Sequence, residues 1–281
     1  SRYYTEAEVN SIVSGLEARI AQLESLLQNV TRNGNDVTFS GVNVSIVNGT
    51  GKTDGTVNGL GNLIVGYNEP RGSGDDRSGS HNIVAGSKNN YSSYGGLVVG
   101  YLNTISGAYA TVSGGSINTA EQVYASVSGG LENTASGHYS SVSGGSYNMA
   151  ISWCSNVGGG SQNTTDGDYA SVSGGLSNRA GGGYSAVSGG DNNEARGHYS
   201  SISGGKYNIA RGDHSFVGGG GGESSSLGNI AYGEFSAILG GRENKTGSST
   251  NPSKGIYSTV SGGWSNLASG DAASISGGRD N

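Results

Sequence analysis

The sequence predicts an all-β fold, a β-solenoid of coils about fifteen residues long, preceded by an N-terminal α-helical coiled coil. Three observations support this prediction. A short motif with Val-Ser-Gly-Gly and a downstream Asn recurs about every fifteen residues from Leu97 to Asn281. Glycine accounts for 55 of the 281 residues and phenylalanine for only 3, a composition that suits thin coils with many turns. The first 32 residues have apolar side chains at alternating spacings of four and three instead. A fixed short period is typical of solenoids, in which each copy is one unit stacked on the next.

Residues 1–32 are predicted to form the coiled-coil stalk, with a helix that runs from Glu6 to Val30. Its apolar seam follows the spacing of coiled coils and consists of Val9, Val13, Leu16, Ile20, Leu23, Leu27 and Val30. β-Branched residues at position a with leucine at d favour two strands, whereas Leu26 at position g widens the seam and favours more. The alternative is one amphipathic helix packed on a globular body, but the sequence provides no body with a matching apolar surface.

Residues 33–96 are predicted to be a β neck followed by the first, irregular coils. The pattern of Val37, Phe39, Val42, Val44, Ile46 and Val47 predicts two short strands, separated by Asn-Gly and Asp-Gly turns. The segments that begin at Leu63 and Ile83 resemble the repeat, and the polar residues 70–80 between them predict a surface loop.

Residues 97–281 are predicted to form the regular coils, the first of them anchored at Leu97. Each copy has an aliphatic anchor; nearly all copies have an Asn six residues after it, and most have an aromatic residue three before it. The clearest anchors are Val112, Val127, Val142, Val172 and Val187, the clearest asparagines Asn118, Asn133, Asn148, Asn178 and Asn193, and the clearest aromatic residues Tyr109, Tyr139, Tyr169 and Tyr199. Cys154 and His214 occupy the aromatic position of their own copies.

Backbone physics assigns a role to each position of the repeat. The Gly-Gly pair is expected to form a tight corner with positive φ angles, and Asn a second corner, with its amide bonded to the neighbouring coils. The tyrosines are expected to stack as a ladder or to form a seam between chains, and the alternative is a stripe that binds carbohydrate or protein. The longer spacers 218–234 and 242–258 predict loops outside the stack, which are either contact sites or tolerated length variation.

Such thin coils, with Val, Ala and Ser directed inward, bury little apolar surface. Small solenoids are usually stabilised by disulfides, metals or partner subunits. The single cysteine excludes an intrachain disulfide. The sequence therefore predicts that the principal partner of this chain is the chain itself.

Catalytic, cofactor and metal sites are not predicted. His138 and His198 share a repeat position but lie four coils apart, about 19 Å at the usual strand spacing, so they cannot share a metal within one chain. The net charge of −6 and the absence of a basic, aromatic-rich patch indicate no nucleic-acid partner. No apolar run approaches the length of a membrane span. We therefore predict that the chain is not an enzyme, has no cofactor and does not span a membrane.

A coiled-coil stalk, a neck and short coils such as Val127-Ser-Gly-Gly-Leu-Glu-Asn133-Thr-Ala135 resemble the heads of YadA-type trimeric autotransporter adhesins. Similar repeats occur in the tail fibres of phages and phage-like particles. The unit here reads Ser-Val-Ser-Gly-Gly, where those heads more often have Ser-Val-Ala-Ile-Gly, and the stalk precedes the head. The resemblance implies a left-handed parallel β-roll, a homotrimer, and binding to host or extracellular surfaces.

These observations together predict a non-enzymatic fibrous surface protein, an adhesin or receptor-binding head. Its partners are expected to be host or extracellular-surface proteins or glycans, and its location the cell surface or extracellular space, or alternatively a virion or phage-like particle. The alternative function is that of a purely structural fibre or spacer, such as a tail-fibre shaft or an extracellular filament component. Ice binding by a flat Ser/Thr face is a third, more distant alternative.

Overall fold

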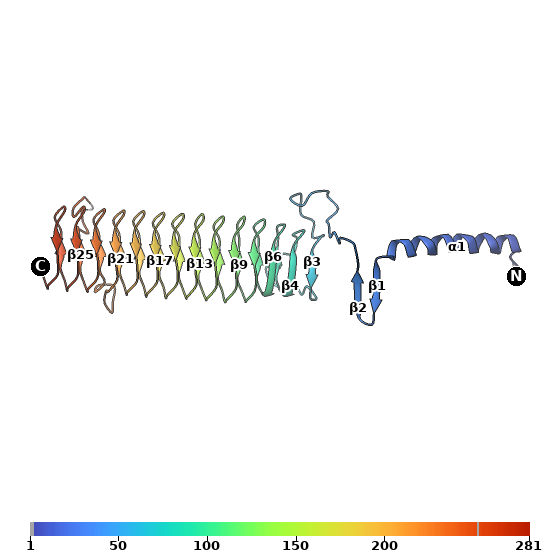
Figure 1. The fold of residues 1–281 in the computed structure, drawn as a ribbon, viewed down its shortest axis with the longest axis horizontal. Helices are drawn as coiled ribbons and strands as arrows, with labels where there is room; N and C mark the ends of the chain where they lie inside the picture. Colours follow the sequence, from blue (N-terminus) through green and yellow to red (C-terminus); the bar gives the residue numbers. More distant parts are fainter. Residues whose placement is uncertain (1–2, 252) are drawn as a thin grey trace. The chain divides into compact units, whose positions relative to one another are not determined.

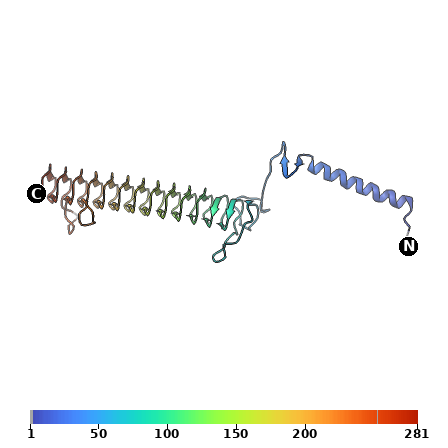
Figure 2. The ribbon, with the colours of Figure 1, turned by 90° about the horizontal axis from the view of Figure 1, so that it is seen from below.

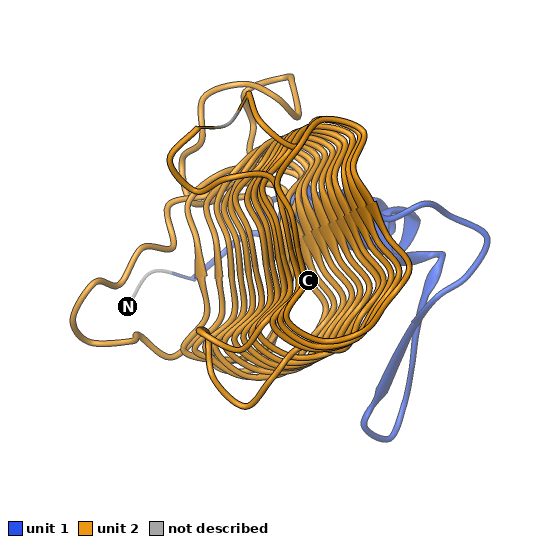
Figure 3. Cartoon of the chain, turned by 90° about the vertical axis from the view of Figure 1, so that its left-hand side faces the viewer, with its two compact units in different colours: residues 1–46 blue, residues 47–281 orange. Residues whose placement is uncertain are grey.

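A computed structural model describes residues 3–251 and 253–281 of the chain. Residues 1, 2 and 252, which fall within the predicted stalk 1–32 and the predicted loop 242–258, lie outside the described residues. The chain forms an all-β solenoid of about 13 parallel turns with one N-terminal helix, as the repeat predicted (Figure 1). It divides into two compact units, Ser1–Ile46 and Val47–Asn281 (Figure 3).

The first unit contains helix α1, Glu6–Leu27, and a hairpin of β1, Val30–Asn33, and β2, Asp36–Phe39. A capping box begins the helix: the Thr5 hydroxyl accepts the N–H of Glu8 at 3.3 Å, and the Glu8 carboxylate accepts the N–H of Thr5 at 2.8 Å. None of the α1 residues is buried within the chain.

Two predictions for this unit are wrong in detail. The helix ends at Leu27 and not at Val30, which pairs with Phe39 in the hairpin instead. The β-branched pair Val30-Thr31 before an Asn-Gly turn favours a strand over a last helical turn. Of the two strands expected between residues 37 and 47, only β2 forms, because residues 42–47 have no partner strand within the described chain.

The second unit consists of two parallel sheets with one strand of each in nearly every coil (Figures 1 and 2). The larger, 14-stranded sheet, here called the valine sheet, contains β3 Leu63–Val65, β4 Ile83–Ser87, β6 Leu97–Tyr101, β8 Thr111–Val112, β10 Ser126–Val127, β12 Ser141–Val142, β14 Asn156–Val157, β16 Ser171–Val172, β18 Ala186–Val187, β20 Ser201–Ile202, β22 Phe216–Val217, β24 Ala237–Ile238, β26 Thr259–Val260 and β28 Ser274–Ile275. The 12-stranded sheet, here called the alanine sheet, contains β5 Asn90–Tyr91, β7 Thr104–Ile105, β9 Thr119–Ala120, β11 Thr134–Ala135, β13 Met149–Ala150, β15 Thr164–Thr165, β17 Arg179–Ala180, β19 Glu194–Ala195, β21 Ile209–Ala210, β23 Ile230–Ala231, β25 Lys245–Thr246 and β27 Leu267–Ala268.

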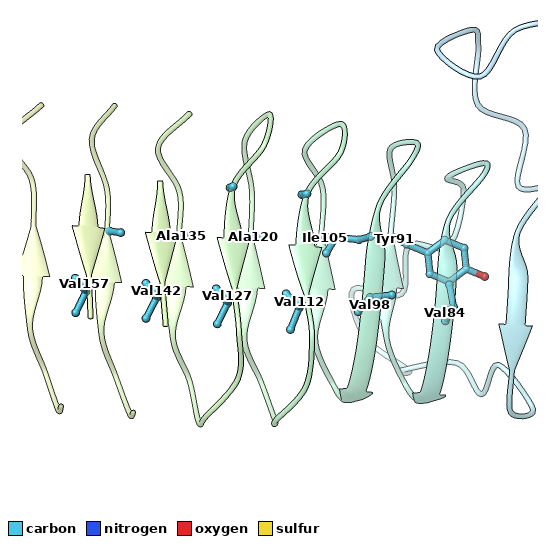
Figure 4. Close-up of a cluster of buried hydrophobic side chains, with 13 residues drawn as sticks. Val84, Tyr91, Val98, Ile105, Val112, Ala120, Val127, Ala135, Val142 and Val157 are labelled. Carbon is cyan, nitrogen blue, oxygen red and sulfur yellow. The ribbon is translucent and has the colours of Figure 1, made fainter. Parts of the chain in front are cut away.

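The core is a thin double column between the two sheets. Anchor valines such as Val127 and Val142 point inward from one sheet and alanines such as Ala135 from the other, all of them buried (Figure 4). Strand register places each anchor opposite the anchor of the next coil, and Val260 and Ile275 continue the column after the longer spacers. The exception is the first anchor, because Val98, not Leu97, pairs with Val112. The coil between them has 14 residues, one fewer than the regular coils that follow.

The corners differ from the predicted ones. Only the second glycine of each pair adopts a left-handed conformation throughout the stack, for example Gly115 with φ +79°. The second corner uses the residue before the repeated Asn, such as Glu132 with φ 54°, so the prediction that Asn itself occupies the left-handed region is wrong. The aromatic position is also left-handed, at φ 58° for Tyr109. A main-chain hydrogen bond to the preceding coil holds each such residue, as from the N–H of Tyr124 to Ala108 at 3.1 Å.

The two longer spacers are loops, and each departs from the stack over a shorter range than expected. Within 218–234, Gly221 still bridges to Lys206 and β23 is already in register, so residues 222–228 form the projecting loop. Within 242–258, β25 is in register, and the chain leaves the stack at Gly247 and has returned to it by Gly255. The one helix described is not apolar enough for its length to cross a bilayer.

Candidate interaction surfaces

A buried ladder of asparagine side chains holds the coils in register. The Asn148 amide donates to the carbonyl oxygens of Gly144 at 2.9 Å and of Gly160, in the next coil, at 3.0 Å. Its Oδ1 accepts the backbone N–H of Asn163 at 3.0 Å. The asparagines named from the sequence, Asn118, Asn133, Asn148, Asn178 and Asn193, occupy equivalent places and are all buried. Because every amide group is bonded along the axis, the side chains on the outside of the coils rest on a rigid support.

Asn229 belongs to the same ladder but does not stand out in the sequence. Its backbone N–H donates to Oδ1 of Asn208 at 3.1 Å, and its own Oδ1 accepts the backbone N–H of Asn244 at 3.0 Å. The inserted loop 222–228 moves it away from the position six residues after Val217. The tripeptide Asn-Ile-Ala, present at 208–210 and again at 229–231, is the signal that could have identified it.

One corner of the solenoid is lined by stacked aromatic rings, here called the aromatic row. It consists of Tyr94, Tyr109, Tyr124, Tyr139, Tyr169, Tyr184, Tyr199, His214, Phe235 and Tyr257. From Tyr169 to Phe235 successive ring centroids lie 4.7 to 4.9 Å apart and the planes are nearly parallel. His214 is a ring of this row, as its repeat position predicted, whereas Cys154 interrupts it, and Trp153 stacks on Tyr169 at 6.3 Å.

The geometry of the aromatic row restricts what it can bind. Its rings are about half exposed, as in Tyr184 at 50% and Tyr199 at 53%. Each ring covers the faces of its neighbours, so ring edges and hydroxyl groups form most of the outer surface. The row can therefore contact a partner through edges and hydrogen bonds along its length, but it offers little open ring face.

The outward side chains of the two sheets differ in character. Those of the valine sheet are mostly small hydroxyl residues, such as Thr111, Ser126 and Ser141. In the alanine sheet the corresponding column reads Thr104, Thr119, Thr134, Met149, Thr164 and Arg179. The threonine rank that an ice-binding face would need is thus interrupted.

A network of charged side chains crosses the alanine sheet. Arg179 pairs with Asp166 and with Glu194, the latter at 2.5 Å, and Glu194 also pairs with Arg196 at 2.5 Å. Burial raises the pKa of Glu194. Hydrogen bonds from Arg196 and Arg179 lower it by more than burial raises it, so the pKa lies below the ordinary value of 4.5. The hydrogen bond to Asp166 raises the pKa of Arg179 above its ordinary value. Each group is thereby held in its charged form, as in a structural ion-pair network.

The histidines do not gather at one place. His81 accepts the N–H of Asn48 at 3.1 Å through Nε2, His214 lies in the aromatic row, and His138 and His198 lie in separate coils. Among residues 3–251 and 253–281, no group of three or more His, Cys, Asp or Glu side chains is arranged to hold a metal ion.

Apolar side chains that the chain itself leaves uncovered are concentrated before the regular coils. On α1, Leu16 is 50% and Leu23 57% exposed, and the rest of the predicted seam within the helix is similarly exposed. The first strand of the valine sheet, β3, has all three of its side chains exposed, with Val65 at 61%. Exposed apolar surface on this scale is typical of protein contacts.

Ser248 and Ser249, which follow strand β25, border two hollows that the sequence did not indicate. One, of about 260 Å³, is lined by Arg211, Asp213, Tyr232, Glu234, Ser248 and Ser249. The other, of about 280 Å³, is lined by Tyr232, Lys245, Ser248, Ser249, Leu267 and Ser269. Tyr232 and the two loop serines line both.

The chain is similar to a known family of surface proteins over a short segment. Residues 258–270 match the family model of the ubiquitous surface protein adhesin repeat. No curated protein matches the chain. The matched segment includes β26 and β27 with the turn between them, that is, one strand of each sheet. Together with the solenoid fold, this match suggests a non-enzymatic, adhesin-like role at an extracellular or cell surface.

Proposed function

We propose that this chain is the stalk and head of a homotrimeric adhesin that binds host or extracellular surfaces through the outer face of its solenoid. The observation on which the proposal rests is the aromatic row, a line of half-exposed rings on a scaffold held by the buried asparagine ladder. Many weak contacts repeated along one chain, and multiplied by three chains, give strong attachment without a deep pocket. The adhesin-repeat match at 258–270 supports the same class of protein.

Trimerisation is supported by the exposed apolar residues at the N-terminal end. Most of the stability of a protein helix comes from packing of its apolar face, and no residue of the 22-residue helix α1 is buried within the described chain. Partner helices would cover the seam of Val9, Val13, Leu16, Ile20, Leu23 and Leu27, whereas Val30 belongs to the hairpin. Partner chains would also cover β3, an apolar strand at the end of a sheet that would otherwise invite uncontrolled pairing. The left-handed winding implied by the YadA-type resemblance remains a prediction.

The adhesive role is tested with beads coated with the full chain on cultured epithelial cells and on immobilised extracellular matrix. We expect the triple variant Tyr169→Ser/Tyr184→Ser/Tyr199→Ser to reduce bead attachment about tenfold or more, because it removes three adjacent rings of the row. The matched control is Tyr147→Ser/Tyr207→Ser, which removes tyrosines of a different corner and should leave attachment unchanged.

The alternative function, a structural fibre or spacer, predicts a different result. A spacer contributes length but no affinity, so wild-type beads would attach no better than albumin-coated beads. That outcome, with the protein folded, would contradict the adhesin proposal.

A further inference from the structure

We propose that Tyr232, Lys245, Ser248 and Ser249 form a binding site for a terminal acidic sugar, a pyranose ring with a carboxylate. This proposal deepens the adhesive role and rests on it for its biological context. Four features of the region around β23 and β25 support it: an uncovered ring face, a hollow of suitable size, an unpaired cation and a set of free hydroxyl groups.

Tyr232 differs from the tyrosines of the aromatic row in how its ring is covered. It follows β23 in the alanine sheet, and the guanidinium of Arg211, from the preceding coil, lies over its ring at 5.8 Å. In the next coil the equivalent position is Gly247, because β23 and β25 pair Ala231 with Thr246. No side chain from that position covers the ring. The side of Tyr232 that faces the next coil therefore borders the hollow of about 280 Å³.

The inserted loop gives this hollow its walls. Gly247 has φ +74°, and a Cβ there would lie 2.7 Å from the backbone nitrogen of Gly233. The chain can therefore turn out of the stack directly beside Tyr232. Ser248 and Ser249 line the same hollow as Tyr232, together with Leu267 and Ser269 from the coil beyond. The space fits one sugar ring rather than an extended peptide.

The charges favour an acidic ligand on this side of the ring. Lys245 lines the hollow and makes no ion pair and no side-chain hydrogen bond within the described residues. By contrast, Lys206 in an earlier coil is paired with Asp191 at 3.1 Å. The two carboxylates near Tyr232, Asp213 and Glu234, line the other hollow together with Arg211. A ligand carboxylate would therefore meet the Lys245 ammonium in the hollow of about 280 Å³.

The proposed contacts match the chemistry of such a sugar. The apolar face of a pyranose packs on an aromatic ring face, and its hydroxyl groups exchange hydrogen bonds with serine hydroxyls and backbone groups. Among the residues described, Ser249 and Ser269 have no side-chain hydrogen bond, so both hydroxyls are free to bind. A neutral sugar would make the same ring contact but would leave Lys245 unpaired.

The test is direct binding of methyl glycosides to the purified full chain, measured by ligand-detected NMR and calorimetry. The probes are the methyl glycosides of N-acetylneuraminic acid and glucuronic acid, with methyl galactoside as the neutral comparison. We expect an acidic glycoside to bind at least about tenfold more tightly than the neutral one. Tyr232→Ala and Lys245→Gln should each weaken acidic-sugar binding about tenfold, and Tyr232→Phe should retain it within about twofold because the ring face remains.

Controls and contrary outcomes separate this proposal from the adhesin proposal. Tyr147→Ala and Lys206→Gln remove residues of the same types outside the hollow and should leave sugar binding unchanged. Equal binding of acidic and neutral glycosides, no binding of any of them to the folded protein, or full binding by Tyr232→Ala would overturn the proposed site. If beads of the Tyr232→Ala variant then still attach to cells as the wild type does, the adhesin proposal stands without it.

Discussion

Replacing Gly115 by alanine is expected to destabilise the solenoid by about 3 kcal/mol, whereas the same change at Gly114, one residue earlier, is expected to be nearly neutral. Gly115 has φ +79°, and a Cβ there would lie 2.2 Å from the carbonyl oxygen of Gly130 and 2.6 Å from Nδ2 of Asn118. The neighbouring backbone cannot move away, because Gly130 meets Gly145 in the same manner. A Cβ on Gly114 would have no neighbouring atom within 4 Å.

The pair is measured by guanidinium unfolding, monitored by far-ultraviolet circular dichroism at equal protein concentration. Since the two sites are adjacent, they share the same coil, exposure to denaturant and composition. Equal midpoints for Gly115→Ala and Gly114→Ala would mean that the corner is neither left-handed nor closely approached by the next coil.

Replacing Asn148 by alanine is expected to cost about 4 kcal/mol, because its side chain is hydrogen-bonded both to its own coil and to the next. The change removes the Oδ1 acceptor of the buried N–H of Asn163 and the amide donor to the carbonyls of Gly144 and Gly160. Each unsatisfied buried polar group costs about 1 to 3 kcal/mol. The thin coil has no space for another side chain to take over the lost hydrogen bonds. Because coils contact only their neighbours, the loss should also separate the unfolding of the two halves.

The matched control for this change is Asn156→Ala on the outer face of β14. Asn156 makes a single side-chain bond, to the hydroxyl of Ser141 at 2.5 Å, and is partly exposed. We expect a loss below about 1 kcal/mol there. A calorimetric scan in which Asn148→Ala and Asn156→Ala lower the melting temperature equally would show that the buried ladder does not hold the coils together.

The stacked architecture was predictable because each coil obeys the same local rules. The fifteen-residue period fixes strand register, so Val127, Val142 and even Val260 beyond the inserted loops lie where their repeat position predicts. The corner conformations were not predictable in the same way. Asn favours left-handed turns in isolation. Here its side chain points inward, where it satisfies the hydrogen bonds of the buried backbone, and the preceding residue, such as Glu132, adopts the left-handed conformation instead. The heptad spacing also extended over Val30, although a nearby Asn-Gly turn directs that residue into a hairpin.

The candidate surfaces were only partly visible in the sequence. The aromatic row follows from one repeat position, including His214, which replaces a tyrosine. The ring faces are covered and the ring edges exposed because of the distance between coils. The sequence alone did not predict this arrangement. Tyr232 gave no signal, since its repeat position is otherwise filled by Ser, Glu, Ile, Asp, Gly and Arg. Its open face arises from Gly247 and from the path of an irregular loop, neither of which the period describes.

The most direct test of the account is the absolute mass of the full chain in solution, measured by light scattering coupled to size exclusion. The proposed homotrimer, which would cover the exposed seam of α1 and strand β3, predicts a particle of three times 28.1 kDa that persists on dilution. A stable, folded monomer of 28.1 kDa would contradict the homotrimeric adhesin and would leave a single-chain solenoid as the functional form.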